Sequence, residues 1–360
     1  MSTMDRRSFT KLSMLATAAA ALPLRAESQQ RVRFAPVGLG VISNIFMKAC
    51  AQSSKCKVTA LVTGHAAEKA PKYEALYGIS PKSVYNYENY DEIAQNPDID
   101  AVYIGLPNSM HAEYTIRAAK AGKHVLCEKP MAISSAECRQ MIDACRKHNV
   151  KLMIAYRVHY DPMWQQIRKM ARSGAIGEIQ GFQGGFYGSK TSGWRLDRKL
   201  AGGGSLLDLG IYPMNTIRWI AAEEPASFSA QVATRLPGPR FSSVEESIEF
   251  TMKFPSGLLA SSGSSYGEEG GAYLGIGGTQ GRLWVEPAFD YEGLKFRGDT
   301  IHGPVNATSP GKLPYQFTYE ADHFADCVRN NTEPATPGEE GLKDLLAMEA
   351  IYRAAGAPIA

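Results

Sequence analysis

Two short segments carry the residues of this chain that are best suited to chemistry. The segment CEKP holds Lys129, and the later segment GGGSLLDLGIYP holds Asp208 and Tyr212. An ammonium group, a carboxylate and a phenol can together take the proton from a hydroxyl group while hydride leaves its carbon. The same groups can polarise a carbonyl in the reverse direction. The two segments therefore predict an oxidoreductase that acts on alcohols, provided that the chain also binds a hydride acceptor.

A glycine turn near the start of the chain predicts that acceptor. VGLGVIS follows an apolar run and opens a helical pattern, with Gly38 and Gly40 in the first two positions of a dinucleotide fingerprint. Gly38 suits the tight turn, while Gly40 lets the backbone approach a pyrophosphate at the helix N-terminus. The third position departs from the pattern because it is Ser43. A plain glycine turn is the alternative.

The end of the second predicted strand indicates which nucleotide is bound. An NAD site wants an acidic residue there for the ribose 2′-hydroxyl, but the stretch ALVTGHAAEK has none at the strand end. Thr63 and Lys69 can instead hold a 2′-phosphate, with Gly64 and His65 between them. We therefore expect NADP(H). The alternative is an ordinary polar loop with a solvated lysine.

Further residues follow the next strands. In parallel sheets, ligands bind beyond the carboxyl ends of the strands, and GLPNSMHAE places Asn108 and His111 there. Both are expected near the nicotinamide half of the cofactor, although His111 could instead cap the helix that follows.

Tyr212 is the candidate base of the catalytic set. A free tyrosine has a pKa of about 10, so it needs positive neighbours. Lys129 and an oxidised nicotinamide supply that charge. Asp208 lies four positions before Tyr212, so in a helix both face one way and Asp208 can orient the substrate. The alternative is structural: Asp208 caps the helix and Tyr212 packs against a neighbour.

The elements that must position these residues fall into two groups. From Val32 to Ala155, short apolar runs alternate with helical patterns, which predicts a doubly wound parallel sheet. Pro36 is an anomaly in the first strand, because it cannot donate to a ladder. The predicted strands and helices are 32–37, 58–62, 101–106, 124–126 and 152–155, and 112–121 and 136–148.

After Ala155 the pattern changes to period-two segments separated by glycine, proline and serine, which predicts an α+β domain with a large, mostly antiparallel sheet. We expect a Rossmann domain over 31–155 and a substrate-binding and dimerisation domain over 156–360. An open sheet face predicts a homodimer. The predicted strands and helices are 178–187, 227–235, 247–254, 258–266, 272–276 and 282–285, and 161–173, 211–221, 320–330 and 340–354.

The N-terminus predicts export. Residues 1–26 combine the pair Arg6 and Arg7 with an apolar run from Leu12 to Leu24, which is shorter than the about 20 residues of a membrane span. The pattern is typical of a twin-arginine signal, so we expect a periplasmic protein that folds before export. A basic tail followed by a short helix is the alternative.

Composition narrows the function further. The formal net charge of +3 gives no basic face for nucleic acid. The six cysteines have neither CxxC nor metal-ligand spacing, so we expect buried free thiols and no metal.

Together these motifs resemble the glucose–fructose oxidoreductase, inositol dehydrogenase and MocA family over nearly the whole chain after residue 26. The resemblance rests on GLG, LPNSMHAE, AGKHVLCEKP, KLMIAYRVHYDP, WRLDRKLAGGGSLLDLGIYP and TPGEEGLKD. Most of the family has histidine where this chain has Tyr212. Tyrosine there is the choice of glucose–fructose oxidoreductase, and that enzyme and the aldose–aldose oxidoreductases are the most similar members.

The resemblance implies a sugar oxidoreductase that keeps NADP(H) bound, oxidises an aldose at C1 to its lactone and then reduces a second sugar. It implies catalytic roles for Lys129, Asp208 and Tyr212. Trp194, Arg195, Tyr160 and Tyr266 are also candidates for the sugar pocket. The residues implied to line the cofactor are Gly38, Leu39, Gly40, Thr63, Lys69, Tyr87, Leu106, Asn108, His111, Glu128, Lys129, Arg157, Trp194 and Arg195.

Three other functions stay open at this point. An ordinary dehydrogenase would exchange its cofactor, and an NAD-dependent glycosidase of this fold would oxidise its sugar only transiently. A binding protein would keep the scaffold without turnover.

Overall fold

The structure is a computed structural model that describes residues 31–236 and 238–357. The predicted twin-arginine segment, 1–26, lies outside the described residues. Within the described ranges, no helix is both long and apolar enough to cross a bilayer.

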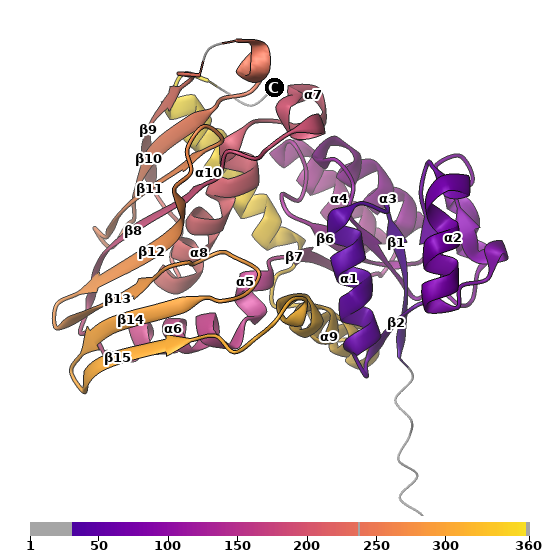
Figure 1. The fold of residues 1–360 in the computed structure, drawn as a ribbon, viewed down its shortest axis with the longest axis horizontal. Helices are drawn as coiled ribbons and strands as arrows, with labels where there is room; N and C mark the ends of the chain where they lie inside the picture. The colour runs from indigo at the N-terminus through magenta and orange to yellow at the C-terminus, as the bar shows by residue number, and fades with distance from the viewer. Residues whose placement is uncertain (1–30, 237, 358–360) are drawn as a thin grey trace, which may run out of the picture. The chain divides into compact units, whose positions relative to one another are not determined.

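A seven-stranded parallel sheet is built from the first part of the described chain (Figure 1). Its order is β4-β3-β1-β5-β6-β7, and β2 also pairs with β1. The sheet order and the alternation with helices confirm the predicted Rossmann architecture. The strands are β1 (Val32–Val37), β2 (Cys56–Val58), β3 (Leu61–Val62), β4 (Val84–Tyr85), β5 (Ala101–Ile104), β6 (His124–Glu128) and β7 (Leu152–Ala155).

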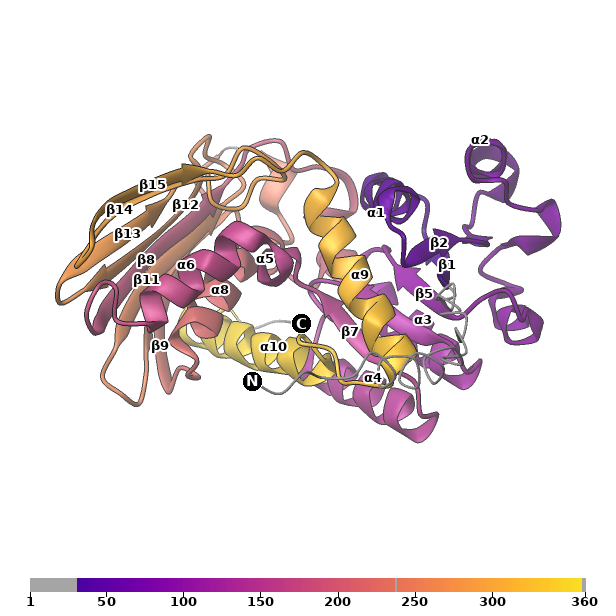
Figure 2. The ribbon, with the colours of Figure 1, turned by 90° about the horizontal axis from the view of Figure 1, so that it is seen from below.

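Helices cover both faces of this sheet, as Figure 2 shows. Val102 and Ile104 of β5 belong to the core formed with α3 and α4. Ala101 and Tyr103 point the other way, into the core formed with α1 and α9. This alternation is why the strands are apolar along their whole length. The helices are α1 (Val41–Gln52), α2 (Ala66–Tyr77), α3 (His111–Lys120), α4 (Ser135–Lys147) and α9 (Tyr315–Asn330), with short 3-10 turns at Pro81–Ser83, Tyr90–Gln95 and Asn108–Met110.

The single strand predicted over 58–62 is wrong, because it is split between β2 and β3. The split accommodates Pro36. Thr59 N donates to Phe34 O, and Gly38 N donates to Val62 O, so alternate residues of β1 face this neighbour. Pro36, between them, faces the interruption, where its missing N–H costs no ladder bond.

The second part of the chain forms an eight-stranded sheet of order β15-β14-β13-β12-β8-β11-β10-β9. Every pair is antiparallel except β8 with β11. The predicted fold class is thereby confirmed. The strands are β8 (Ile179–Tyr187), β9 (Ser227–Ala233), β10 (Ser247–Lys253), β11 (Leu259–Ser265), β12 (Gly271–Gly278), β13 (Gly281–Val285), β14 (Lys295–Thr300) and β15 (Gly303–Thr308).

One face of this second sheet packs against helices, and Figure 1 shows no helix against the other face. α8 contacts β8, and α10 contacts β9. The remaining helices are α5 (Arg157–Tyr160), α6 (Pro162–Arg172), α7 (Arg198–Ala201), α8 (Ile211–Ala221) and α10 (Gly338–Ala354). A π-helical turn, Leu206–Gly210, leads into α8, and 3-10 turns lie at Gly193–Leu196 and Pro239–Phe241.

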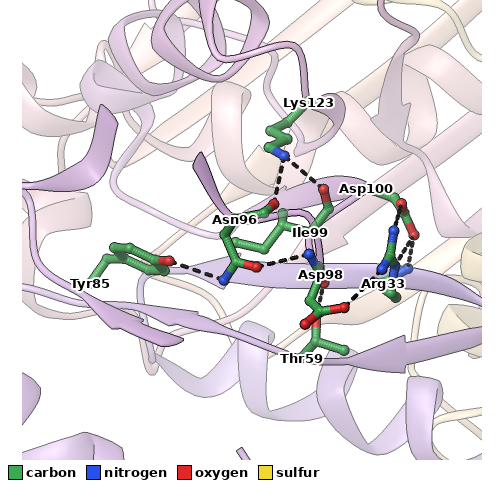
Figure 3. Close-up of polar contacts among 8 residues, drawn as sticks. All are labelled: Arg33, Thr59, Tyr85, Asn96, Asp98, Ile99, Asp100 and Lys123. Carbon is green, nitrogen blue, oxygen red and sulfur yellow. Dashed lines mark hydrogen bonds and ion pairs between the residues drawn. The ribbon is translucent and has the colours of Figure 1, made fainter. Parts of the chain in front are cut away.

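Polar contacts join the loops at the amino end of the parallel sheet, away from the predicted site (Figure 3). The buried Lys123 donates from Nζ to the carbonyl oxygens of Asn96, at 3.0 Å, and Ile99, at 2.9 Å. Arg33 Nη2 lies 2.6 Å from Asp100 Oδ1. Burial lowers the pKa of Lys123. These groups satisfy one another and the backbone, so we assign them a structural role.

The six cysteines are all buried and unpaired, in agreement with the expectation of free thiols.

Candidate active site

A cavity of about 880 Å³ lies at the carboxyl end of the parallel sheet and reaches the π-turn and α8. Every catalytic and cofactor-binding residue predicted from the sequence lines it. They are Gly38, Leu39, Gly40, Thr63, Lys69, Tyr87, Leu106, Asn108, His111, Glu128, Lys129, Arg157, Trp194, Arg195, Asp208 and Tyr212.

The glycine turn between β1 and α1 fits a pyrophosphate. Gly38 has a φ of +84°, and a Cβ there would lie 2.7 Å from Gly105 O, so no other residue fits. A Cβ on Gly40 would meet nothing within 4 Å, which leaves the backbone open to a ligand. α1 begins without a side-chain cap or an acid in its first turn. Its N–H groups and dipole are therefore available to an anion.

Ser43 replaces the third glycine of the fingerprint without loss of close packing. Its side chain is fully buried. A Cβ on Gly105 would lie 2.5 Å from Ser43 Oγ. The close approach that the third glycine normally permits is thus provided by the missing side chain of Gly105 on the opposite segment.

The ribose end of the cavity has donors and a cation but no acid at the strand end. Thr63 follows β3 directly, His65 precedes α2, and Lys69 lies in its first turn. Within the described ranges, the Lys69 side chain forms no hydrogen bond or ion pair. A Cβ on Gly64 would lie 2.8 Å from the ring of Tyr87, so that ring closes this end.

Asn108 and His111 support the site through the backbone. Asn108 Nδ2 donates to Ala201 O at 2.8 Å. The fully buried His111 has Nδ1 2.9 Å from Pro130 O and Nε2 2.9 Å from Leu106 O. Burial lowers the pKa of His111, so the ring is neutral and donates to one of the two carbonyls. His111 thus fixes the segment that carries Lys129.

Lys129 and Asp208 meet across the cavity. Lys129 Nζ donates to Asp208 O at 2.7 Å and lies 3.5 Å from Asp208 Oδ1. Asp208 Oδ2 lies 3.1 Å from Arg195 Nε and accepts from the Tyr266 hydroxyl at 3.1 Å. Burial opposes the charge of Asp208, but Lys129 and Arg195 outweigh it and lower its pKa. Asp208 is therefore a carboxylate between two cations.

Asp208 does not cap α8, which excludes the structural alternative for this residue. The helix begins at Gly210 without any side-chain cap. The carboxylate instead points to the cavity residues described above.

Tyr212 lies between two cations. Lys129 Nζ is 4.4 Å and Arg157 Cζ is 4.9 Å from the centre of its ring. Burial opposes the charge of Arg157, yet Tyr212 and Tyr291 raise the pKa of this guanidinium. Arg157 was predicted only as a cofactor contact, but it also flanks the candidate base. Its Nη1 donates to Asp290 O at 3.3 Å, which ties α5 to the loop after β13.

Glu128 directly precedes Lys129 and also lines the cavity. It is buried, and the Tyr103 hydroxyl donates to it. Burial raises its pKa, while Tyr103 and Lys129 oppose the rise.

The sequence did not reveal part of the cavity wall. Phe186 of β8 and the residues Phe289, Asp290 and Tyr291 line it, but no local motif marks them. Tyr266 reaches Asp208, as its candidacy for the pocket predicted. Tyr160 does not line the cavity, because its hydroxyl bonds to Thr336 Oγ1 at 2.7 Å. Within the described ranges, no group of three or more His, Cys, Asp or Glu residues could hold a metal.

The fold and site define a nicotinamide nucleotide-dependent oxidoreductase, and comparison with known proteins gives its family. The model of the oxidoreductase family with an NAD-binding Rossmann fold matches residues 32–156, and the model of the GFO/IDH/MocA C-terminal domain matches residues 164–284. The chain belongs to the GFO/IDH/MocA family.

Individual relatives act on sugars. The chain is 39% identical to the solved aldose-aldose oxidoreductase from Caulobacter crescentus complexed with glycerol, with a TM-score of 0.87, covering 91% of this chain and 98% of that one. It is 31% identical to the D-xylose 1-dehydrogenase [NADP(+)] of Haloarcula marismortui, covering 90% and 91%. A levoglucosan dehydrogenase complex with NADH and levoglucosan, 23% identical with a TM-score of 0.78 and covering 91% and 98%, shares the fold. The protein is a sugar oxidoreductase with a nicotinamide-binding Rossmann domain.

Proposed function

We propose that this protein holds NADP(H) without releasing it and shuttles hydride between two sugars. One aldose is oxidised at C1 to the aldonolactone, and a second aldose or ketose is then reduced to an alditol. The observation that carries the proposal is the arrangement of Lys129, Asp208 and Tyr212 at one end of a cavity. The other end offers Thr63 and Lys69, which has no ion pair among the described residues. The likeness to an aldose-aldose oxidoreductase and to an NADP(+) xylose dehydrogenase supports it.

The residues of this chain divide the work of binding. The turn 38–40 would hold the pyrophosphate and Lys69 the 2′-phosphate. When bound, the oxidised nicotinamide accepts the hydride from the sugar C1. Asp208 receives a sugar hydroxyl and orients the ring. Arg195, whose Nε lies 3.1 Å from Asp208 Oδ2, keeps that carboxylate ionised.

Tyr212 takes the proton of the reacting hydroxyl. Two cations flank its ring, and positive neighbours favour the phenolate that this role requires. Lys129 hydrogen-bonds the reacting oxygen and polarises the carbonyl of the second sugar in the reverse direction. Because the proton and the hydride return to the second sugar, the cycle needs no exchange of nucleotide.

A bound cofactor also agrees with the proposed location. The N-terminal twin-arginine pattern supports export of the folded protein to the periplasm, which has no pool of NADP(H). A dissociable cofactor would be lost there, whereas a cofactor loaded before export is regenerated in place.

The test is to add glucose to purified, extensively dialysed protein without any nucleotide and to follow the absorbance of reduced nicotinamide. We expect a rise that stops near one equivalent per subunit and is reversed by a second sugar. A rise only after NADP is added would make the protein an ordinary dehydrogenase. Release of an aglycone from a nitrophenyl sugar, without net reduction, would make it a glycosidase. If the protein reacts with neither sugar, with or without added NADP, we would conclude that it is a binding protein.

The preference for NADP(H) has its own test. After the cofactor is stripped, Lys69→Ala should weaken NADP(H) binding about tenfold or more and leave NAD(H) binding unchanged, because a hydrogen bond to a charged group contributes about 1.5–3 kcal/mol. Lys72→Ala, on the same helix but absent from the cavity wall, is the matched control. Equal losses for both nucleotides would contradict the preference.

We also propose a homodimer through the open face of the second sheet. A hollow of about 1120 Å³ on that sheet is lined by strand residues that include Trp284, Leu259 and Arg297. Leu259 is 57% exposed in the single chain, and a partner would cover it. Light scattering should give twice the chain mass, and Leu259→Glu with Trp284→Glu should give the monomer. A monomeric wild type would refute the dimer.

A further inference from the structure

A second, much smaller cavity lies behind the catalytic lysine and tyrosine. It has a volume of about 10 Å³, and Lys129 and Tyr212 line both it and the large cavity. They therefore separate the two. Its remaining walls come from the segment after β7 and from α8: Tyr156, Val158, Ile211, Asn215 and Thr216.

The small cavity has the size and the polarity that hold one water molecule. Tyr156 and Thr216, which are 5% and 1% exposed, carry hydroxyl groups that form no hydrogen bond within the described ranges. Buried hydroxyls rarely lack partners, and a cavity of about 10–15 Å³ with two or more polar partners holds a water. Lys129 can supply a third contact, since its ammonium has three donors, and Asp208 accepts from two of them, through O at 2.7 Å and Oδ1 at 3.5 Å.

Beyond Tyr156 lies a buried acid that the proposed reaction has not used. The Tyr156 hydroxyl neighbours the carboxyl of Asp344 on α10. Asp344 is fully buried and accepts from Asn215 Nδ2 at 3.0 Å and from Arg218 Nη1. It ends the TPGEEGLKD segment that the sequence singled out. The surrounding charged or titratable groups are Arg218 on α8, Glu340 on α10, Glu224 before β9, Cys138 on α4 and, through Asn215, His159 on α5.

We propose that Tyr156, Thr216 and one water in this cavity form a proton relay between Lys129 and Asp344. The inference rests on the proposed sugar oxidation. As hydride leaves C1, the O–H bond of the sugar breaks and its proton passes to the Tyr212 phenolate. Tyr212 returns to the phenolate by giving this proton to Lys129, which gives one of its own to the water. The water passes a proton to Tyr156 Oη, and the Tyr156 proton forms an O–H bond on Asp344. Lys129, the water and Tyr156 end unchanged, and the reverse transfer returns the proton when the second sugar is reduced.

In this pathway Tyr212 initiates the removal of the proton, and Asp344 stores it between the two half-reactions. Burial raises the pKa of Asp344 to about 7, against the opposing effect of Arg218. The carboxylate, which can accept the proton, is thus present above about pH 7 and absent below it. The oxidation step should accelerate as the pH rises through this range, and the reduction step should slow.

The experiment measures both half-reactions in single turnovers from about pH 5 to 9. Tyr156→Phe should slow each step about tenfold or more and abolish the opposite pH dependences. The substitution removes one hydroxyl and keeps the ring, so the fold should persist, and Thr216→Val should give the same direction. Tyr160→Phe is the matched control, because that hydroxyl bonds to Thr336 outside both cavities. Wild-type rates and pH profiles in Tyr156→Phe would overturn the relay.

A high-resolution crystal structure supplies a readout that does not depend on turnover. We expect a water within hydrogen-bond distance of Tyr156 and Thr216 in the wild type, and its loss in Thr216→Val. A dry wild-type cavity would overturn the relay whatever the activity. A wild type that holds the water but oxidises no sugar would count against the proposed function instead, and the relay would fall with it.

Discussion

Replacing Asp208 with asparagine tests the role of its carboxylate separately from the position of Lys129. The shortest contact of Lys129 Nζ is to the main-chain oxygen of Asp208, at 2.7 Å, while the carboxylate lies at 3.5 Å. Asparagine keeps that main-chain oxygen and the shape of the side chain. Lys129 should therefore stay in place, and only the charge of residue 208 is lost.

The expected loss can be worked out from the contacts of Oδ2. The pair with Arg195 is 42% exposed on the arginine side, so solvent screens it and it contributes at most about 1 kcal/mol. A sugar hydroxyl bound to the carboxylate contributes about 1.5–3 kcal/mol. The sum is about 1.5–4 kcal/mol, or a fall in kcat/KM of about 10-fold to 1000-fold.

The assay is steady-state sugar turnover with the cofactor bound, measured from about pH 5 to 8. Lys129 and Arg195 lower the pKa of Asp208 despite its burial, so wild type carries the carboxylate throughout and the ratio of the two enzymes should not change with pH. Asp290→Asn is the control: Asp290 lines the same cavity, but its side chain forms no hydrogen bond or ion pair within the described ranges. A loss within threefold would refute contact between Asp208 and the sugar. A loss near 10⁵-fold would mean that Asp208 takes part in proton transfer, and would refute the assignment of this residue to sugar binding alone.

Three further predictions follow from the same contacts. Lys129→Met should lower kcat about 10²-fold to 10⁴-fold while the protein still carries its nucleotide, measured after denaturation; loss of the nucleotide would mean that Lys129 mainly binds it. Burial lowers the pKa of His159 to about 3, so between about pH 6.5 and 3 the imidazole is protonated in the unfolded chain and neutral in the native chain. The free energy of unfolding should therefore fall by about 1.4 kcal/mol for each unit by which the pH is lowered. In urea unfolding between about pH 6.5 and 5, His159→Gln should reduce the slope of the free energy of unfolding against pH. An unchanged slope would mean that other groups cause the pH dependence. Because all six thiols are buried and free, a thiol reagent should react with none in the native protein and six in urea, and a reductant should not change Tm.

The fold was predictable where the burial of a strand on one or both faces determines the pattern of its apolar residues. The first sheet has strands that are apolar on both faces, and the second has alternating burial, as in Ile248, Phe250 and Met252 of β10. In the second sheet, the two strands that the sequence did not predict are β14 and β15. Their sequences, KFRGDT and GPVNAT, contain glycine, proline and charge, and their residues are mostly exposed or half-buried at one end of the sheet. At such an edge, neither apolar periodicity nor β propensity is required.

The site was predictable where a motif fixes the position of a residue on a strand end. Lys129 directly follows β6, and Thr63 directly follows β3, so both face the same edge of the sheet. Tyr291 and Phe289 lie in the loop after β13, far from Lys129 along the chain. Only the packing of the second sheet brings them to the cavity. The second role of Arg157 was hidden for the same reason: its neighbours Tyr212 and Tyr291 are distant in sequence.

The charge around residue 212 explains why a tyrosine suits this site. Lys129 and Arg157 both lie within 5 Å of its ring centre, at 4.4 and 4.9 Å. Asp208 is already shared between Lys129 and Arg195. The cavity wall has three cations, Lys129, Arg157 and Arg195, against the acids Asp208 and Glu128 next to them, so the local balance is positive. A tyrosine base is anionic before it takes a proton and neutral afterwards, so the surrounding charge stabilises the form that must react. A histidine base is neutral before and cationic afterwards, and the same cations would oppose its protonation. Tyr212→His should therefore lower kcat in this chain unless Arg157 is neutralised with it.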